Sequence, residues 1–147
     1  MKILFIEDTG EAAYPLKDYL EEEGHVVILA GNCAVAQDRL GEEDIDCLIV
    51  DLNMEPIGLE PEEIEQTRCG LLTGWVWLKN HIFSRDNAMR RRTVILTAYD
   101  REFKDMIPSE ERCGLKVLSK NPAQGDIYTE ILKVVNAIGK RLKKRAR

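Results

Sequence analysis

The chain has 147 residues, of which 44% are hydrophobic and 32% are charged, and its formal net charge is -5. This length suits one folded domain, and the hydrophobic content is too high for a generally disordered protein. The charge gives no overall nucleic-acid signature, and the longest apolar run, Val26 to Ala30, is far too short to span a membrane. We therefore expect one cytoplasmic domain over residues 1–147, without signal peptide, membrane anchor or output domain.

Five short apolar runs predict five strands that are buried on both faces of a sheet. In chain order they are Ile3 to Ile6, Val26 to Ala30, Leu48 to Val50, Thr93 to Leu96, and Val117 to Leu118. Segments with helical spacing of apolar residues lie between them, and the clearest is the last, with Ile127, Ile131, Val135, Ile138 and Leu142 on one stripe. The alternation predicts a doubly wound α/β domain with parallel strands and right-handed crossovers.

Two segments depart from this regular pattern. Pro15 falls where the first helix should already be running, so that helix either begins late or bends, and we expect the late start. The 22-residue connection from Leu52 to Thr73 exceeds the roughly 12 to 15 residues above which structureless loops become uncommon. Pro61, followed by a glutamate-rich stretch, predicts a short acidic helix within this 52–73 insert.

The cysteines and histidines give no catalytic signature. The four cysteines show no CxxC or other metal-ligand spacing, so we expect free thiols in a reducing cytoplasm. His25 and His81 are far apart in the sequence and show no partners there, so we expect neither to be a catalytic residue.

The basic C-terminal tail, residues 140–147, contains six Lys or Arg. Three interpretations are open: cations favourably placed at a helix C-terminus, an arm for nucleic acid or acidic lipid, or the start of a linker to an output domain. We favour the first, and expect neither a membrane nor a nucleic-acid partner.

Polar side chains follow four of the predicted strands. Because the carboxyl ends of parallel strands share one edge, where ligands bind at the reversal of strand order, we expect these side chains to converge. They are Glu7 and Asp8 after the first strand, Asp51 after the third, Thr97 after the fourth and Lys120 after the fifth. The sequence therefore predicts a pocket containing three carboxylates, a hydroxyl and an ammonium group.

This set of groups suits transfer of a phosphoryl group to the Asp51 carboxylate. Clustered acids repel an anionic phosphoryl donor, so a cation is required, and Mg²⁺ favours oxygen ligands of this kind. The expected metal ligands are Glu7, Asp8, Asp51 and the backbone carbonyl of Asn53. Lys120 would balance the developing charge, and the Thr97 hydroxyl would bind phosphoryl oxygens.

Four motifs at the predicted strand ends resemble the CheY-like receiver domain of bacterial two-component response regulators. They are IEDTG, LIVDLNM, ILTA and LSKNP, in the correct order and over essentially the whole chain. The resemblance implies a five-stranded sheet of order 2-1-3-4-5. It also implies phosphorylation of Asp51 by a sensor histidine kinase or phosphotransfer protein, with slow hydrolysis of the aspartyl phosphate at most and no enzymatic turnover.

The same resemblance implies how phosphorylation would change the surface of the protein. Thr97 would shift towards it and reshape the surface around the fourth main helix and fifth strand, where a downstream effector would bind. Asn53 and Tyr99 occupy positions that in this family tune how long the phosphoryl group persists. Such domains often form homodimers.

Three features depart from the family pattern. Val117 stands where an aromatic switch residue is usual, Asn121 separates Lys120 from Pro122, and the 52–73 insert is long. These departures favour an alternative, a degenerate receiver that acts as a phosphorylation-independent interaction module, whereas the intact acids, Thr97 and Lys120 oppose it. A second alternative is a Mg²⁺-dependent phosphatase with an aspartyl nucleophile, such as the haloacid dehalogenase group. The motif order and Asn53, in place of a second Asp, oppose it.

Overall fold

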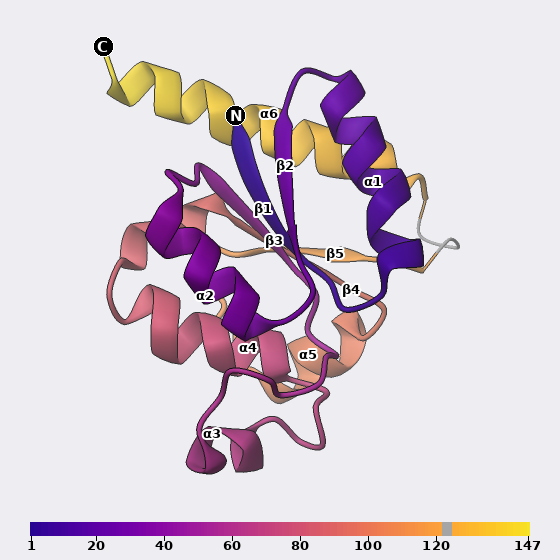
Figure 1. The fold of residues 1–147 in the computed structure, drawn as a ribbon, viewed down its shortest axis with the longest axis vertical. Helices are drawn as coiled ribbons and strands as arrows, with labels where there is room; N and C mark the ends of the chain where they lie inside the picture. The colour runs from indigo at the N-terminus through magenta and orange to yellow at the C-terminus, as the bar shows by residue number, and fades with distance from the viewer. Residues whose placement is uncertain (122–124) are drawn as a thin grey trace.

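The computed structural model describes residues 1–121 and 125–147, which form a five-stranded parallel sheet between two layers of helices (Figure 1). The strands are β1 (Lys2–Ile6), β2 (Val26–Ala30), β3 (Cys47–Val50), β4 (Thr93–Thr97) and β5 (Lys116–Ser119). They are all parallel and lie in the order β2-β1-β3-β4-β5. The predicted doubly wound sheet of order 2-1-3-4-5 is confirmed, and each predicted apolar run falls inside an observed strand.

The helices cover both faces of the sheet (Figure 1). On one face lie α1 (Gly10–Glu22) and α6 (Ile127–Arg145), and on the other lie α2 (Cys33–Glu42), α4 (Thr73–Trp77) and α5 (Asp100–Met106). The π-helical segment η1 (Leu78–Phe83) continues α4, and the 3-10 turn η2 (Asn87–Arg92) leads into β4. No helix among residues 1–121 and 125–147 is both long and apolar enough to cross a membrane.

Each face of the sheet has its own apolar core, as uninterrupted apolar strands predict. All four residues of β3 are fully buried because they contribute alternately to the two cores. Trp75 and Trp77 are each 1% exposed and pack in the core under α2, α4 and α5. The four cysteines are free thiols, as predicted.

The first helix does not begin late, so that prediction is wrong. α1 starts at Gly10 and contains Pro15 in its interior. Proline has no N–H to donate to the carbonyl four residues earlier, so α1 lacks one backbone hydrogen bond there. Ala13, Leu16 and Leu20 are at most 3% exposed against the sheet, and this burial offsets the lost bond.

The 52–73 insert contains the predicted acidic helix, α3 (Pro61–Gln66), with Pro61 in its first turn. The Glu63 carboxylate accepts hydrogen bonds from Asn80 Nδ2 at 2.9 Å and His81 Nε2 at 2.8 Å. His81 was expected to have no partner, whereas it anchors the insert to η1.

The start of α4 packs directly against the chain that follows β3. The Gly74 N–H donates to the Leu52 carbonyl at 3.1 Å. A Cβ atom at position 74 would lie 2.1 Å from the Asp51 carbonyl oxygen and 3.0 Å from Val50 Cγ1. Only glycine allows this approach, so Gly74 fixes the distance between α4 and the loop that carries Asp51.

We predict that Gly74→Ala lowers the free energy of unfolding by about 2 kcal/mol or more, since the added methyl group collides with backbone that cannot easily move. Urea unfolding measures the change. Gly41→Ala is the control, because that glycine lies inside α2 and no atom outside that helix lies within 4 Å of the new methyl group. It should raise stability by up to about 1 kcal/mol. Equal effects of the two substitutions would contradict the packing argument.

Candidate functional site

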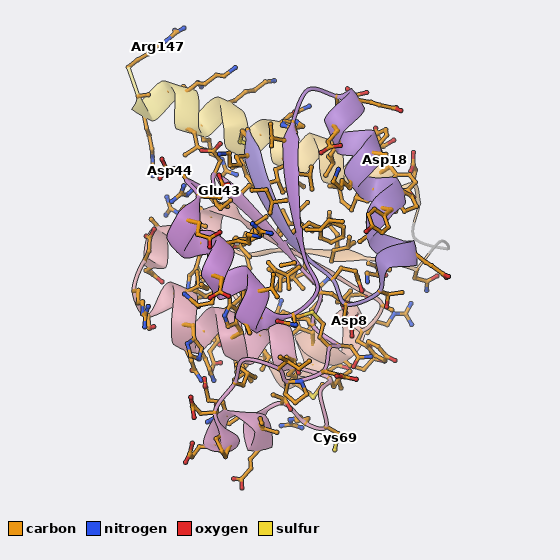
Figure 2. The ribbon with its side chains drawn as sticks, viewed as in Figure 1. Asp8, Asp18, Glu43, Asp44, Cys69 and Arg147 are labelled. Carbon is orange, nitrogen blue, oxygen red and sulfur yellow. The ribbon has the colours of Figure 1, made fainter. Side chains whose placement is uncertain are left out.

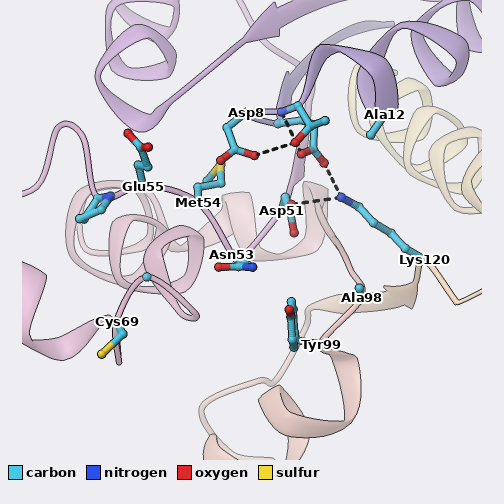
Figure 3. Close-up of a pocket in the computed structure, with 14 residues that line it drawn as sticks. Asp8, Ala12, Asp51, Asn53, Met54, Glu55, Cys69, Ala98, Tyr99 and Lys120 are labelled. Atoms are coloured by element: carbon cyan, nitrogen blue, oxygen red, sulfur yellow. Dashed lines mark hydrogen bonds and ion pairs between the residues drawn. The ribbon is translucent and has the colours of Figure 1, made fainter.

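An acidic pocket of about 490 Å³ lies at the carboxyl edge of the sheet (Figure 3). β1 and β3 are neighbours, but the chain runs from β1 to β2 on one side and from β3 to β4 on the other, so a crevice opens between their carboxyl ends at this switch point. The predicted site residues that line the pocket are Glu7, Asp8, Asp51, Asn53 and Lys120.

Backbone hydrogen bonds beyond the strand ends hold three of these residues at the edge. The Glu7 N–H donates to the Ala30 carbonyl at 3.0 Å, and the Asp51 N–H donates to the Ile6 carbonyl at 3.0 Å. The Lys120 N–H donates to the Thr97 carbonyl at 2.9 Å. Apolar strand residues are therefore followed directly by charged residues, and backbone hydrogen bonds hold those charged residues in place.

The Lys120 ammonium group bridges two of the carboxylates across the pocket (Figure 3). It forms ion pairs with Glu7 and with Asp51, the latter at 3.1 Å between Nζ and Oδ2. Oxygens of Glu7, Asp8 and Asp51 all lie within 4.8 Å of one another. Three carboxylates face one ammonium group, so the cluster carries excess negative charge when all three are ionised.

The crowding changes the protonation of Glu7. Burial and the neighbouring Asp51 raise the pKa of Glu7 from 4.5 to about 7, although the ion pair with Lys120 opposes the rise. Burial alone would lower the pKa of Lys120, but Asp51 and Glu7 outweigh it and the pKa is raised. The ammonium group therefore stays charged, while Glu7 is only partly ionised near pH 7 when no further cation is present.

The donor set fits Mg²⁺. That ion prefers a few carboxylate oxygens with water and an occasional carbonyl, and two of the clustered carboxylates here are buried with too little positive charge around them. Asp8 is exposed, which leaves room for water on that side. Asn53 lines the pocket next to these acids, so its backbone lies near the place where a further oxygen ligand is needed.

Thr97 differs from the other predicted site residues. Its side chain is fully buried and does not line the pocket, and its hydroxyl accepts a hydrogen bond from the Tyr99 N–H at 3.2 Å. Tyr99 itself is 38% exposed and does line the pocket. Thr97 therefore lies behind the pocket wall, tied to the loop between β4 and α5.

The 52–73 insert forms one wall of the pocket, through Glu55, Pro56 and Cys69 (Figure 3). The chain reverses here through a left-handed run at Arg68, Cys69 and Gly70, with φ of 52°, 60° and 88°. Glu55 adds an acidic group to the pocket rim.

Hydrogen bonds close the base of this wall. The Met54 N–H donates to the Gly70 carbonyl at 3.3 Å, and the buried Thr73 hydroxyl donates to the Met54 carbonyl at 2.7 Å. Sequence reasoning missed Thr73, because nothing in its spacing indicates a role near the site.

Two of the departures from the family pattern lie on the β5 side. Val117 is half-buried and packs against the core under α5. The Asn121 N–H donates to the Ser119 hydroxyl at 3.0 Å, and Pro122 lies outside the described residues.

No protein-family model and no curated protein matches the chain. Solved structures do match it along nearly their whole lengths. A two-component response regulator from Clostridium difficile is 23% identical, with 97% of this chain and 98% of that chain covered and a TM-score of 0.68. The chain has the receiver-domain fold.

Two further receiver-fold structures are similar. A Francisella response regulator receiver domain is 21% identical, with 96% of this chain and 98% of that chain covered and a TM-score of 0.64. The response regulator TrrA from Thermotoga maritima, crystallised with Mg²⁺ and BeF, is 21% identical, covers 90% of this chain and 97% of that chain, and has a TM-score of 0.60. The resemblance predicted from the motifs is thus confirmed for the fold.

The raised pKa of Glu7 makes stability depend on pH. A carboxyl group whose pKa is higher in the folded chain binds its proton more tightly there, so its contribution to stability falls as the pH rises from about 4.5 to about 7. We predict that the free energy of unfolding of the wild type falls by about 2 kcal/mol relative to that of Glu7→Gln between about pH 5 and pH 8, part of the effect being screened by solvent.

Urea unfolding in EDTA measures this difference, so that no divalent cation contributes. Glu11→Gln, which removes an exposed carboxylate from the first turn of α1, is the control. A difference between wild type and Glu7→Gln that does not change with pH would contradict the assignment.

Proposed function

We propose that residues 1–147 form a single phosphoacceptor receiver domain of two-component signalling, in which Asp51 accepts a phosphoryl group from a histidine kinase or phosphotransfer protein. The observation that supports this most is the Lys120 ammonium group held between Glu7 and Asp51 at the switch point of a receiver-type sheet. The proposal places the protein in the cytoplasm, with a downstream effector as a second partner.

In the proposed reaction a carboxylate oxygen of Asp51 attacks the phosphorus of a phosphohistidine. A P–O bond forms, the P–N bond breaks, and the leaving imidazole nitrogen takes a proton. Mg²⁺ held by Glu7, Asp8, Asp51 and the Asn53 carbonyl would neutralise charge on the phosphoryl oxygens. Lys120 would bind one of those oxygens, for which its long side chain is placed at the pocket.

The two carboxylate oxygens of Asp51 have different partners, which supports different roles for them in the proposed reaction. Oδ1 accepts the Leu52 N–H at 2.7 Å, while Oδ2 faces Lys120 at 3.1 Å. The Leu52 N–H fixes the carboxylate orientation, so the side chain needs little rearrangement before attack.

In this proposal, Thr97 would convert phosphorylation into a change in conformation. The Thr97 side chain is buried, so it would have to move towards the pocket before its hydroxyl could donate to a phosphoryl oxygen. This movement would pull on the Tyr99 N–H, which donates to the same hydroxyl, and on the loop that opens α5. The effector surface around α5 and β5 would change through this backbone movement, since Val117 has no aromatic ring to rotate.

The alternative, an interaction module without phosphorylation, has support from Val117 and from the buried position of Thr97. The Glu7–Lys120–Asp51 cluster opposes it. Burying these charges costs stability, and an interaction module without phosphorylation does not need them. The phosphatase alternative has no comparable support.

We predict that the protein, incubated with acetyl phosphate and Mg²⁺, gains the mass of one phosphoryl group, and that Asp51→Asn abolishes the gain. EDTA should also abolish it, since the acidic pocket repels the donor without a cation. Asp38→Asn, an exposed carboxylate on α2, is the matched control and should be phosphorylated like the wild type.

Intact-protein mass spectrometry gives the result. An unmodified wild type in Mg²⁺, or equal modification of Asp51→Asn, would refute acceptance at Asp51. Release of many phosphates per protein from simple phosphate esters would favour the phosphatase instead.

We predict that Lys120→Gln slows phosphorylation by about 100-fold, the cost of losing a charged donor at the developing anion. Mg²⁺ affinity should stay the same or increase, because removing the ammonium group leaves the carboxylates more negative. Acetyl phosphate kinetics and calorimetric Mg²⁺ titration separate the two effects. If Mg²⁺ binding and phosphorylation were lost together, Lys120 would be holding the pocket in shape rather than taking part in transfer.

A further inference from the structure

A basic groove lies between two segments that are far apart in the sequence. The turn η2 and the last turns of α6 enclose a cavity of about 250 Å³. The cations that line it are Arg91, Arg92, Arg141, Lys144 and Arg145, and the apolar lining residues are Ala88, Ile138 and Leu142. Arg90 on η2 and Lys140, Lys143 and Arg147 at the end of the chain add further positive charge. We call this surface the basic groove.

The positive charge of the basic groove is poorly compensated. Neither 87–92 nor 139–147 contains an acidic residue. Arg92 forms an ion pair with Asp86 at 3.5 Å. Among residues 1–121 and 125–147, no carboxylate forms an ion pair with Arg91, Lys144 or Arg145. An anion can therefore bind there without displacing an internal partner from these three side chains.

The helix dipole does not account for this density of cations. It favours positive charge only within the last turn of α6. Lys140 with Lys144, and Arg141 with Arg145, are like charges four residues apart on one helix, and such pairs repel. The sequence alone favoured the dipole interpretation, but it did not show that the arginines of η2 lie beside the tail.

The chemistry of the groove favours phosphate groups of a nucleic acid over a membrane surface. Most of its cations are arginines, whose planar guanidinium groups bind phosphate through paired hydrogen bonds. A peripheral membrane helix also needs apolar side chains to insert into lipid. The large apolar side chains that are well exposed in the described residues all lie outside the groove: Tyr14, Val26, Val35, Ile57, Ile64, Tyr99 and Tyr128.

The basic groove lies away from the acidic pocket that contains Asp51. Arg147, near the groove, and Cys69, at the pocket wall, lie at opposite ends of the molecule (Figure 2). η2 enters β4 at the amino edge of the sheet, whereas the pocket is at the carboxyl edge. A polyanion in the groove would therefore leave the pocket open.

We propose that the basic groove binds the phosphate backbone of a nucleic acid without reading its sequence. The cations contact successive phosphates, and the release of condensed counterions supplies the affinity. Glu43 and Asp44, which follow the end of α2, limit the contact on that side (Figure 2). This inference is independent of phosphorylation at Asp51.

The test is fluorescence anisotropy with a labelled duplex DNA of about 20 base pairs and the matching single strand, at several salt concentrations. The expected result is binding at low salt, with the logarithm of the association constant falling with the logarithm of salt concentration at a slope of about -4 for duplex DNA. Arg91→Gln and Lys144→Gln should each weaken binding several-fold and reduce the slope by about one.

Lys133→Gln is the matched control. It makes the same charge change on α6, on an exposed side chain about three turns before Lys144. Its affinity and slope should equal those of the wild type, and circular dichroism checks that all variants keep their helices.

The proposal is overturned if DNA does not bind at low salt, or if Lys133→Gln weakens binding as much as Lys144→Gln. It is also overturned if vesicles of phosphatidylserine bind the protein and DNA does not. Phosphorylation of Asp51 by acetyl phosphate is measured in the same variants. Failure of DNA binding and failure of phosphorylation can then be told apart.

Discussion

The burial of like charges at one edge of the sheet is the constraint on which the rest of the site depends. Two carboxylates at the ends of neighbouring strands repel each other, and the Lys120 ammonium group relieves only part of that repulsion. The backbone tolerates this because Glu7, Asp51 and Lys120 are each fixed by a hydrogen bond that continues the sheet. Hydrogen bonds therefore hold the backbone of the pocket in place, and the pocket is short of positive charge, which favours binding of a divalent cation.

Much of this arrangement could be predicted from the sequence, because it follows from local rules. Uninterrupted apolar runs identify strands that are buried on both faces, and parallel strands bring their carboxyl ends together. Asp51 and Lys120 could therefore be placed in one pocket although 69 positions separate them. Pro61 likewise gave the start of α3, since proline fits the first turn of a helix.

Other features depend on packing that no local rule contains. Pro15 lies inside α1 because burial of that helix against the sheet outweighs one missing hydrogen bond. His81 bonds Glu63 across 18 positions, with no periodicity to indicate it. The direction of the Thr97 hydroxyl depends on the Tyr99 N–H, which only the loop conformation brings within reach. The basic groove also required the fold, since η2 and α6 are separate in the sequence.

Hydrogen bonds at the base of the 52–73 insert hold its two ends together. Met54 is bonded through its N–H to Gly70 and through its carbonyl to Thr73, so the two ends of the intervening segment meet independently of what lies between them. Once the ends of a loop are held together, each doubling of its length costs only about 0.6 kcal/mol of closure entropy. The segment from Glu55 to Cys69 is thus a place where length and composition can vary without disturbing the strands. In evolution or in protein engineering, changes there would alter the pocket wall that Glu55, Pro56 and Cys69 form, while the strands beneath keep their positions.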